Sequence, residues 1–508
     1  MKQTRPERLA RSAQLRSLFA NRTRTLVPLV LVLTACKAVG PDYTVPADAM
    51  INHPLANAPL IETGAPVSQQ PLPPDWWRLY DDPVLDQLVE SALQSNTDLR
   101  VAAANLARSR AAVDVASAQG GFSGSASATL DHAQEAGEQY LLFSKVPVAN
   151  EGNLGLNVSY EFDLFGKLQR GVEAAQADSE AAKAASDLAR VSVVSQVVEA
   201  YVEACSAGDE LTVAQRLLDL QKQRVALSAR LRSAGRGSQP DVTRDQTQAD
   251  TLAADVPRFL GRRRVAEAQL AALLARPASD LPAAVATCDT LPALSQPIPV
   301  GDGAALLKRR PDVREAERQL AAATARIGVA VGEMYPSVEI GASTGTTGLL
   351  GDLFGPATNR WSVGPLISWT FPANGQRARV RAAEAATGGA LAHFDGVVLN
   401  ALRETQSSLA TYAADTQRAE ALQTAYRSAT KAADETHQLY MAGRESFVAD
   451  LDAARTLAAM NAQLEAAMGQ VALDQVSLFR ALGGGWETTE AASLPMPVTG
   501  NSQKTAVD

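Results

Sequence analysis

The sequence lacks the residue patterns on which most catalytic and metal-binding sites depend. It has no HExxH zinc motif and no glycine-rich phosphate loop. Its four histidines are scattered, without the spacing of metal ligands; they are His53, His132, His393 and His437. These absences predict a protein that is not an enzyme and that needs neither a metal nor a dissociable cofactor.

Cysteine and positive charge are also scarce. The chain of 508 residues has three cysteines, Cys36, Cys205 and Cys288, so packing rather than disulfides must supply most of its stability. The residues alone do not decide whether Cys205 and Cys288 pair. Trp76 and Trp77 are expected to anchor the N-terminal segment on the rest of the chain. Lys and Arg total 47 against 55 Asp and Glu, and this net charge of −8 argues against a nucleic-acid partner, which requires basic patches.

Long apolar runs are missing after residue 36. Because a membrane-spanning helix needs about 20 mostly apolar residues, the sequence predicts no such helix there. One short run precedes that position: residues 26–33 are almost wholly apolar and follow seven basic residues within the first 24 positions. A positive head and a short apolar core are typical of a secretory signal. We therefore expect a signal peptide over residues 1–35.

The end of this leader, Leu33-Thr34-Ala35-Cys36, resembles a bacterial lipobox, in which the cysteine becomes the new N-terminus and carries the lipid. We therefore expect a covalent lipid on Cys36. An ordinary signal peptide with a chance cysteine is the alternative. Because Lys37 follows the cysteine in place of Asp, the pattern favours delivery to the outer membrane.

Similar phrases recur in the two halves of the chain at a nearly constant offset. The pairs are NTDLRVAAANLA at 96–107 with RPDVREAERQLA at 310–321, YEFDLFGKLQR at 160–170 with WTFPANGQRAR at 369–379, and RLRSAGRGSQPD at 230–241 with QLYMAGRESFVA at 438–449. This repetition predicts an internal duplication of a domain-sized unit. The expected divisions are an N-terminal segment (36–84), repeat 1 (85–275), a linker (276–301), repeat 2 (302–482) and a tail (483–508).

Each repeat is expected to contain one very long helix, a turn and a return helix. Residues 168–232 and 376–441 lack proline and are rich in Ala, Leu, Gln, Arg and Glu, all good helix formers. At 1.5 Å per residue each such helix is roughly 100 Å long, which no compact domain can hold inside it. Alanine is spread around the helix, which suits packing on two sides, as in the wall of a cylinder. A solvent-exposed coiled coil is the alternative. The return helices are expected over 240–275 and 447–482.

Each repeat is also expected to contribute two strands, because hydrophobic residues alternate there with period two. The predicted strands are 122–131, 153–162, 337–344 and 361–371. One face is predicted to meet lipid, and its residues are Leu154, Leu156, Val158, Tyr160, Phe162, Trp361, Val363, Ile367, Trp369 and Phe371. About ten residues per strand suffice to cross an outer membrane at a tilt. A soluble sandwich with one buried face is the alternative.

Four strands are too few to seal themselves in a membrane. Open strand edges are not tolerated in lipid, and membrane barrels need at least about eight strands. The sequence therefore predicts a barrel that two or more copies of the chain share, without setting the number of copies.

Four phrases resemble the TolC family, in particular its lipoprotein outer-membrane factors of the OprM/NodT kind. They are DWWRLYDDPVLDQLVESALQSNTDL (75–99), YEFDLFGKLQR, RRPDVREAERQLAAATARIGVAVGEMYPS (309–337) and LFRALGGGW (478–486). The resemblance implies a mixed α/β membrane protein: a homotrimer with a twelve-stranded outer-membrane β-barrel, four strands per chain, continued by a long α-helical periplasmic barrel.

The same resemblance implies a function. The chain would be the outer-membrane exit duct of a tripartite efflux pump, anchored by its lipid, extending into the periplasm and passively conducting small molecules such as drugs or other toxic compounds. Its partners would be a periplasmic adaptor protein and an inner-membrane RND transporter. The alternatives are a duct for type I protein secretion and a structural coiled-coil lipoprotein without a pore.

The resemblance places a periplasmic gate near the helix turns. The residues that fall on gate positions or beside them are Tyr440, Asp452, Asp450 and Asp241, while Ala449 and Glu445 depart from the family pattern. Three copies of one acid around a narrow axis favour cations, and Arg444 or Arg236 are candidates to hold the tip closed. The alternative is that the three acids are solvated residues at helix starts.

The turns themselves, Ala234-Gly235-Arg236-Gly237-Ser238 and Ala442-Gly443-Arg444-Glu445-Ser446, combine a glycine that ends a helix with a serine that caps the next. The resemblance adds contact with the adaptor. The expected docking residues are Gly235, Arg236, Ser238, Gly443, Arg444 and Ser446.

Overall fold

The computed structural model describes residues 38–60, 65–136 and 143–486, so Cys36 and the predicted leader lie outside the described residues. The chain is a mixed α/β protein that divides into two compact units. The first comprises Met1–Val45, Arg108–Glu180 and Arg318–Ala392; the second comprises Pro46–Ala107, Ala181–Glu317 and His393–Asp508. Each unit contains segments of both predicted repeats, so the compact units do not follow the repeat boundaries.

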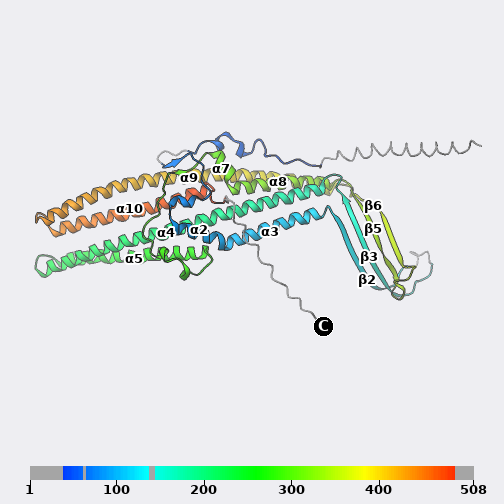
Figure 1. Cartoon of the computed structure of the whole chain (residues 1–508), viewed down its shortest axis with the longest axis horizontal. Helices are drawn as coiled ribbons and strands as arrows, with labels where there is room; N and C mark the ends of the chain where they lie inside the picture. Colours follow the sequence, from blue (N-terminus) through cyan, green and yellow to red (C-terminus); the bar gives the residue numbers. More distant parts are fainter. Residues whose placement is uncertain (1–37, 61–64, 137–142, 487–508) are drawn as a thin grey trace, which may run out of the picture. The chain divides into compact units, whose positions relative to one another are not determined.

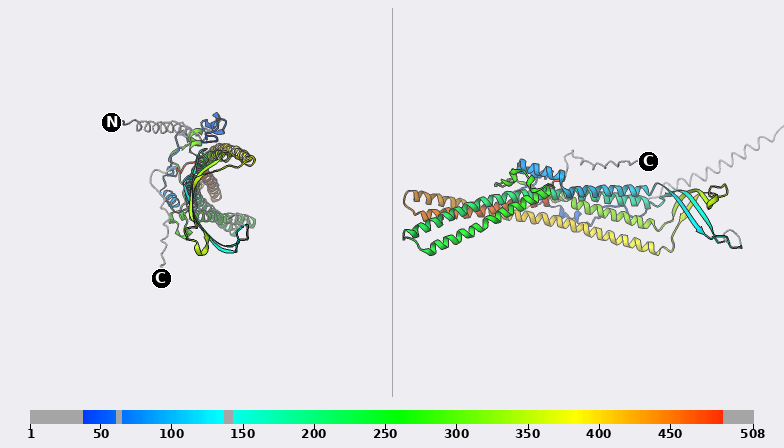
Figure 2. Two further views of the ribbon diagram at one scale, coloured as in Figure 1. Left: turned by 90° about the vertical axis from the view of Figure 1, so that its right-hand side faces the viewer. Right: turned by 90° about the horizontal axis from the view of Figure 1, so that it is seen from below.

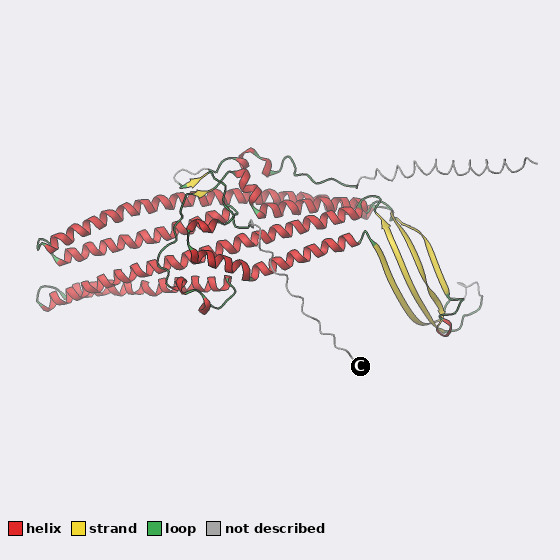
Figure 3. Cartoon of the chain, viewed as in Figure 1, coloured by secondary structure: helices red, strands yellow, loops and turns green. Residues whose placement is uncertain are grey.

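The first unit contains one antiparallel sheet, the layer of four strands in Figures 1 and 3, in the order β2-β3-β5-β6. The strands are β2 (Phe122–Ala133), β3 (Ala149–Phe162), β5 (Ser337–Leu349) and β6 (Asn359–Ser368). All four predicted strands are present. β3 pairs with β5 from Glu151↔Leu349 to Phe162↔Val338, so the two halves of the chain share one sheet. β2 and β6 are its edges and pair with no further strand of the described chain.

The strand register gathers apolar side chains on one face of the sheet. Tyr160 lies opposite Ile340, which lies opposite Pro365. The same face carries Leu154, Leu156, Val158, Phe162, Trp361, Val363 and Ile367. In the single chain Trp361 is 79% exposed and Val363 is 67% exposed. The predicted grouping of these residues on one face is therefore confirmed, and most of that face is uncovered by the other described residues.

Two predicted strand residues lie outside the sheet. β6 ends at Ser368, opposite Ser337, where β5 begins, so no partner backbone continues the ladder. Trp369 and Phe371 follow this end, and their assignment to the strand is wrong. The Trp369 indole N–H donates instead to the Met334 carbonyl oxygen at 3.1 Å.

The helices follow the same order in both halves of the chain. The first half has α2 (Pro83–Ser95), α3 (Thr97–Ala118), α4 (Lys167–Ser233) and α5 (Gln239–Leu273); the second has α7 (Gly303–Arg309), α8 (Pro311–Gly332), α9 (Asn374–Met441) and α10 (Phe447–Ala481). α4 and α9 agree with the predicted long helices to within two residues at each end. Figures 1 and 2 show α5 lying beside α4 and α10 beside α9, as two hairpins. No helix in the described ranges is both long and apolar enough to cross a membrane.

The second unit has a large apolar core. Trp76, fully buried in a short 3-10 helix (Trp76–Tyr80), stacks on Phe479 of α10 with ring centroids 4.4 Å apart. Trp77 packs edge-on beside it. The predicted anchoring of the N-terminal segment by these two tryptophans is thereby confirmed. A two-residue parallel pairing of β1 (Val67–Ser68) with β4 (Ile298–Pro299) ties this segment to the linker before α7.

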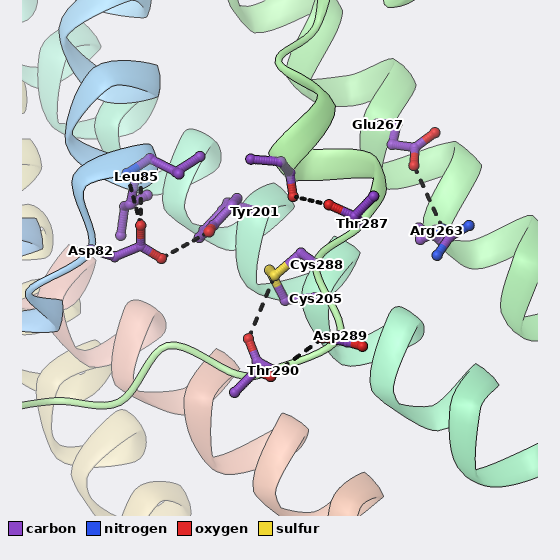
Figure 4. Close-up of a disulfide and its surroundings, with 12 residues drawn as sticks. Asp82, Leu85, Tyr201, Cys205, Arg263, Glu267, Thr287, Cys288, Asp289 and Thr290 are labelled. Carbon is purple, nitrogen blue, oxygen red and sulfur yellow. Dashed lines mark hydrogen bonds and ion pairs between the residues drawn. A yellow bond between two sulfur atoms is a disulfide. The ribbon is translucent and has the colours of Figure 1, made fainter.

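A disulfide joins Cys205 of α4 to Cys288, which follows the short helix α6 (Ala283–Ala286) in the linker (Figure 4). The pairing that the sequence left open is therefore present. One turn before Cys205, the Tyr201 hydroxyl donates to the Asp82 carboxylate at 2.8 Å. Asp82 also caps α2 by accepting the Val84 backbone N–H at 2.8 Å. Together these contacts fasten the linker and α2 to the middle of α4.

In the first unit, the start of the described chain is held beside α4 by Arg170. This arginine is 3% exposed; it donates to the Val39 carbonyl oxygen at 3.1 Å and pairs with Asp42 at 2.6 Å. The Val39 backbone N–H in turn donates to the Phe165 carbonyl oxygen at 3.0 Å, three residues after β3 ends. The segment that follows Cys36 is therefore fixed beside one end of the sheet.

Candidate functional site: the tips of the two helical hairpins

The two hairpin turns have the same backbone geometry. Gly235 and Gly443 adopt φ values of 71° and 69°, in the left-handed region that favours glycine. The next residue of each turn, Arg236 or Arg444, donates its backbone N–H to the residue five positions earlier, at 2.8 Å and 2.9 Å. This is the closing bond of a Schellman motif, in which glycine ends a helix. The shared Ala-Gly-Arg-x-Ser sequence therefore encodes one turn twice and exposes an arginine at each tip.

Serine then begins each return helix. The Ser238 hydroxyl accepts the Asp241 backbone N–H at 3.4 Å, and the Ser446 hydroxyl accepts the Ala449 backbone N–H at 3.1 Å. Asp241 returns the contact by accepting the Ser238 backbone N–H at 3.3 Å, which completes a capping box. The Ser238 hydroxyl also donates to the Asp241 carboxylate, and this bond, followed by the bond from the Ser238 backbone N–H, lowers the pKa of the Asp241 carboxyl. The alternative interpretation of Asp241, as a helix-start residue, thus has a direct structural basis.

Above the turns, one arginine links the two hairpins. Arg224 of α4 pairs with Asp452 of α10, and its Nε also lies 3.0 Å from the Asp245 carboxylate of α5. Arg455 adds a second cation 3.5 Å from Asp452. Asp245 is held in turn by Ser228, whose hydroxyl donates to its carboxylate. The Arg224 link therefore joins three helices through alternating charges.

The second hairpin also has an internal polar contact. His437 Nδ1 of α9 lies 3.2 Å from the Asp450 carboxylate of α10, whose side chain is 15% exposed. Tyr440 packs its ring 5.5 Å from that of Phe447. Asp450 and Tyr440 thus contact their own hairpin, whereas Asp452 contacts the other hairpin.

The structure brings only part of the predicted site together. Of the predicted gate residues, Asp452 takes part in the link between hairpins, and Tyr440 and Asp450 lie nearby within α9 and α10. In the described chain Arg236 and Arg444 are exposed turn residues and Arg224 pairs with Asp452, so the expectation that Arg236 or Arg444 holds the tip closed stays a prediction. Sequence reasoning missed Arg224, because it lies three turns before the tip among several other charged residues of α4.

Farther along α10, two carboxyl groups face carboxyl groups of neighbouring helices. Burial, and then the hydrogen bond and charge of Asp209 on α4, raise the pKa of Glu465 to about 7. Burial, and then Asp415 on α9, raise the pKa of Asp474 to about 6. α10 therefore contains two carboxyls that take up protons near neutral pH.

We expect Glu465→Gln to stabilise the folded chain at pH 8 and to have no effect near pH 4. A carboxyl whose folded pKa of about 7 exceeds its ordinary value of 4.5 gives its full stabilisation below pH 4.5 and loses it as the pH rises through 7. The amide mimics the protonated form, so the gain at pH 8 should be on the order of 1 kcal/mol after discounting for solvent screening.

Unfolding followed at both pH values measures this difference. Glu435→Gln is the control, because Glu435 is an exposed acid of α9 with a 3.9 Å contact to Lys431. A Glu465→Gln variant with the same pH dependence as the wild type would contradict the proton uptake.

Comparison with known proteins gives a consistent result over nearly the whole chain. Residues 88–276 and 304–484 match the family described as outer membrane efflux protein. Nodulation protein T of Rhizobium leguminosarum bv. trifolii is 27% identical over 477 residues, covering 93% of this chain and 99% of the relative. The toluene efflux pump outer membrane protein TtgF of Pseudomonas putida is 28% identical over 483 residues, covering 92% and 98%. The solved structure of the outer-membrane channel OprN matches with a TM-score of 0.78 and 34% identity, covering 88% of this chain and 99% of that one.

Proposed function

This chain belongs to the outer membrane efflux protein family, and from that premise we propose that it is the outer-membrane exit duct of a tripartite efflux pump. It would conduct small molecules passively from the periplasm to the exterior. Its partners would be a periplasmic adaptor and an inner-membrane transporter of the RND type.

The observation that carries the proposal is a membrane-length sheet with an unpartnered apolar face and two open edges. In lipid both edges must pair. β6 runs antiparallel to β2, because each of the three strand pairings reverses direction. β6 of one copy therefore suits β2 of the next, and three copies would supply twelve strands, an even number within the range of membrane barrels.

The position of the N-terminal segment supports a lipid anchor close to the end of the sheet where β3 stops. Val39 and Phe165 are hydrogen-bonded just beyond the end of β3. Three residues of chain reach at most about 10 Å, so a lipid on Cys36 would enter the membrane surface from which the strands emerge. We include this anchor, with outer-membrane location and extension into the periplasm, in the proposal.

The tips complete the proposed duct. The Arg224–Asp452 link would hold the hairpins of one chain together and keep the periplasmic end narrow, with Tyr440, Asp450 and Asp241 nearby. The paired Schellman turns, with Arg236 and Arg444 exposed, would meet the adaptor.

One experiment tests the duct directly. Protein purified in detergent is sized with correction for bound detergent and then reconstituted in planar bilayers. Three chains per particle and stepwise conductance are expected. A monodisperse monomer, or a trimer that never conducts, would refute the proposal. Deletion of the gene should also lower drug tolerance with the envelope intact, which separates a duct from a structural lipoprotein.

A further inference from the structure

The face of the sheet opposite the apolar one contains a single basic side chain within the described strands. Successive layers across the sheet can be followed through the register. The acids lie toward the two ends of this face: Asp131 and Glu151 at one end, Glu161 and Glu339 at the other. Between these acids, each row of residues that lie opposite one another across the strands consists of Ser, Thr, Asn or Gly. The one exception is the row in which Arg360 lies beside Gly345, Gly155 and Ser127.

The exposed side chain of Arg360 reaches across the sheet to β5 and β3. From β6 its Nη2 donates to the Asn153 side-chain oxygen of β3 at 2.8 Å, and its Nε donates to the Thr347 hydroxyl of β5 at 2.9 Å. Gly155 leaves the necessary space, because a Cβ there would lie 3.1 Å from Nη2. The guanidinium is therefore held in a defined position on two neighbouring strands.

The charge of Arg360 has no close counter-charge. Among the described residues it forms no ion pair, and its hydrogen-bond partners are neutral. With a strand rise of about 3.3 Å per residue, the acids of Glu151 and Asp131 lie roughly 7 Å beyond the Asn153 layer, and Glu161 lies roughly 26 Å away on the other side. Arg360 thus offsets one of the two negative charges of Asp131 and Glu151, and this end of the face keeps a net negative charge.

We propose that Arg360 tunes ion selectivity inside the barrel, where three copies would form a ring of fixed positive charge that offsets the neighbouring acids and weakens the preference of the lumen for cations. This inference rests on the proposed function, because only barrel closure turns the polar face inward. At salt concentrations of 10–100 mM the screening length is about 10–30 Å, long enough for such a ring to act on ions in the lumen.

Reversal potentials of reconstituted channels between 10 mM and 100 mM KCl test the inference. Arg360→Gln should raise the permeability of K⁺ relative to Cl⁻ by about twofold or more, because three charges are removed from one ring. Arg360→Lys keeps the charge but not both hydrogen bonds, to Asn153 and Thr347, so its permeability ratio should stay close to that of the wild type. Glu151→Gln, a neutralisation of the neighbouring acid, should shift selectivity the opposite way.

The outcomes separate this inference from the proposed duct. Arg360→Gln channels that conduct with wild-type selectivity would overturn the role of Arg360 and leave the duct standing. A wild-type trimer without conductance would overturn both. Retention of the trimer on gels without boiling shows that each variant is folded before it is recorded.

Discussion

Replacing Arg224 with alanine should open the reconstituted channel, raising its time-averaged conductance about fivefold. Arg224 lies between Asp245 and Asp452 and pairs with both, and its side chain is only 23% exposed. Without it the two carboxylates of α5 and α10 face each other and repel. An ion pair of this exposure is worth up to about 1 kcal/mol, which corresponds to about fivefold in the equilibrium between closed and open tips.

Two further variants test whether loss of the Arg224–Asp452 link causes the rise in conductance. Asp452→Ala breaks the same link but leaves Arg224 paired with Asp245, so its conductance should rise less than that of Arg224→Ala. It should also weaken the block by multivalent cations, since an acid near the axis is lost. Arg444→Ala is the control, because Arg444 is an exposed arginine of the turn with no ion pair among the described residues. Wild-type conductance in Arg224→Ala would show that the link does not hold the tip closed.

Much of the fold could be predicted from local sequence. The runs of helix-forming residues over 168–232 and 376–441 predicted α4 and α9 to within two residues at each end, because helix formation depends on propensities that the sequence displays directly. The alternation of hydrophobic and polar residues likewise predicted the apolar face of β3 and β6, because this pattern can also be read directly from the sequence. Trp369 and Phe371 continue that alternation, yet the strand ends before them, because pairing with β5 rather than side-chain pattern decides where β6 stops.

The contacts between distant segments could not be predicted in this way. The turns can be recognised because their Ala-Gly-Arg-x-Ser signature is local, but Arg224 and Asp452 are 228 positions apart in two different helices, each with other charged residues. Nothing in either helix marks one arginine among many. A candidate could have been found only by asking which cations face the predicted acids once α4 and α10 lie side by side. The internal duplication likewise stays a prediction, consistent with the repeated order of elements.

Loss of Arg310 should destabilise the chain more than loss of any exposed arginine. Arg310 precedes α8, and its side chain is 8% exposed. Its guanidinium binds the Asp312 carboxylate at 2.9 Å and 2.6 Å, the Glu404 carboxylate at 2.9 Å and the Ala481 carbonyl oxygen at 2.7 Å. The last carbonyls of a helix lack partners within it, so Arg310 caps the end of α10 while joining it to α8 and α9.

Arg310→Ala should therefore lower the free energy of unfolding by about 3–5 kcal/mol, the usual cost of breaking a buried charge network. It removes the cation that binds the Asp312 carboxylate and leaves the Ala481 carbonyl with the Thr405 hydroxyl at 3.4 Å. Arg403→Ala is the matched control. Arg403 also contacts Glu404, at 3.7 Å, but its side chain is 64% exposed, so the change should stay within about 0.5 kcal/mol. Denaturant unfolding of both variants at one pH measures the difference. Equal losses would mean that solvent replaces the Arg310 contacts as readily as those of a surface pair, and that α10 is held at this end by apolar packing around Phe479 alone.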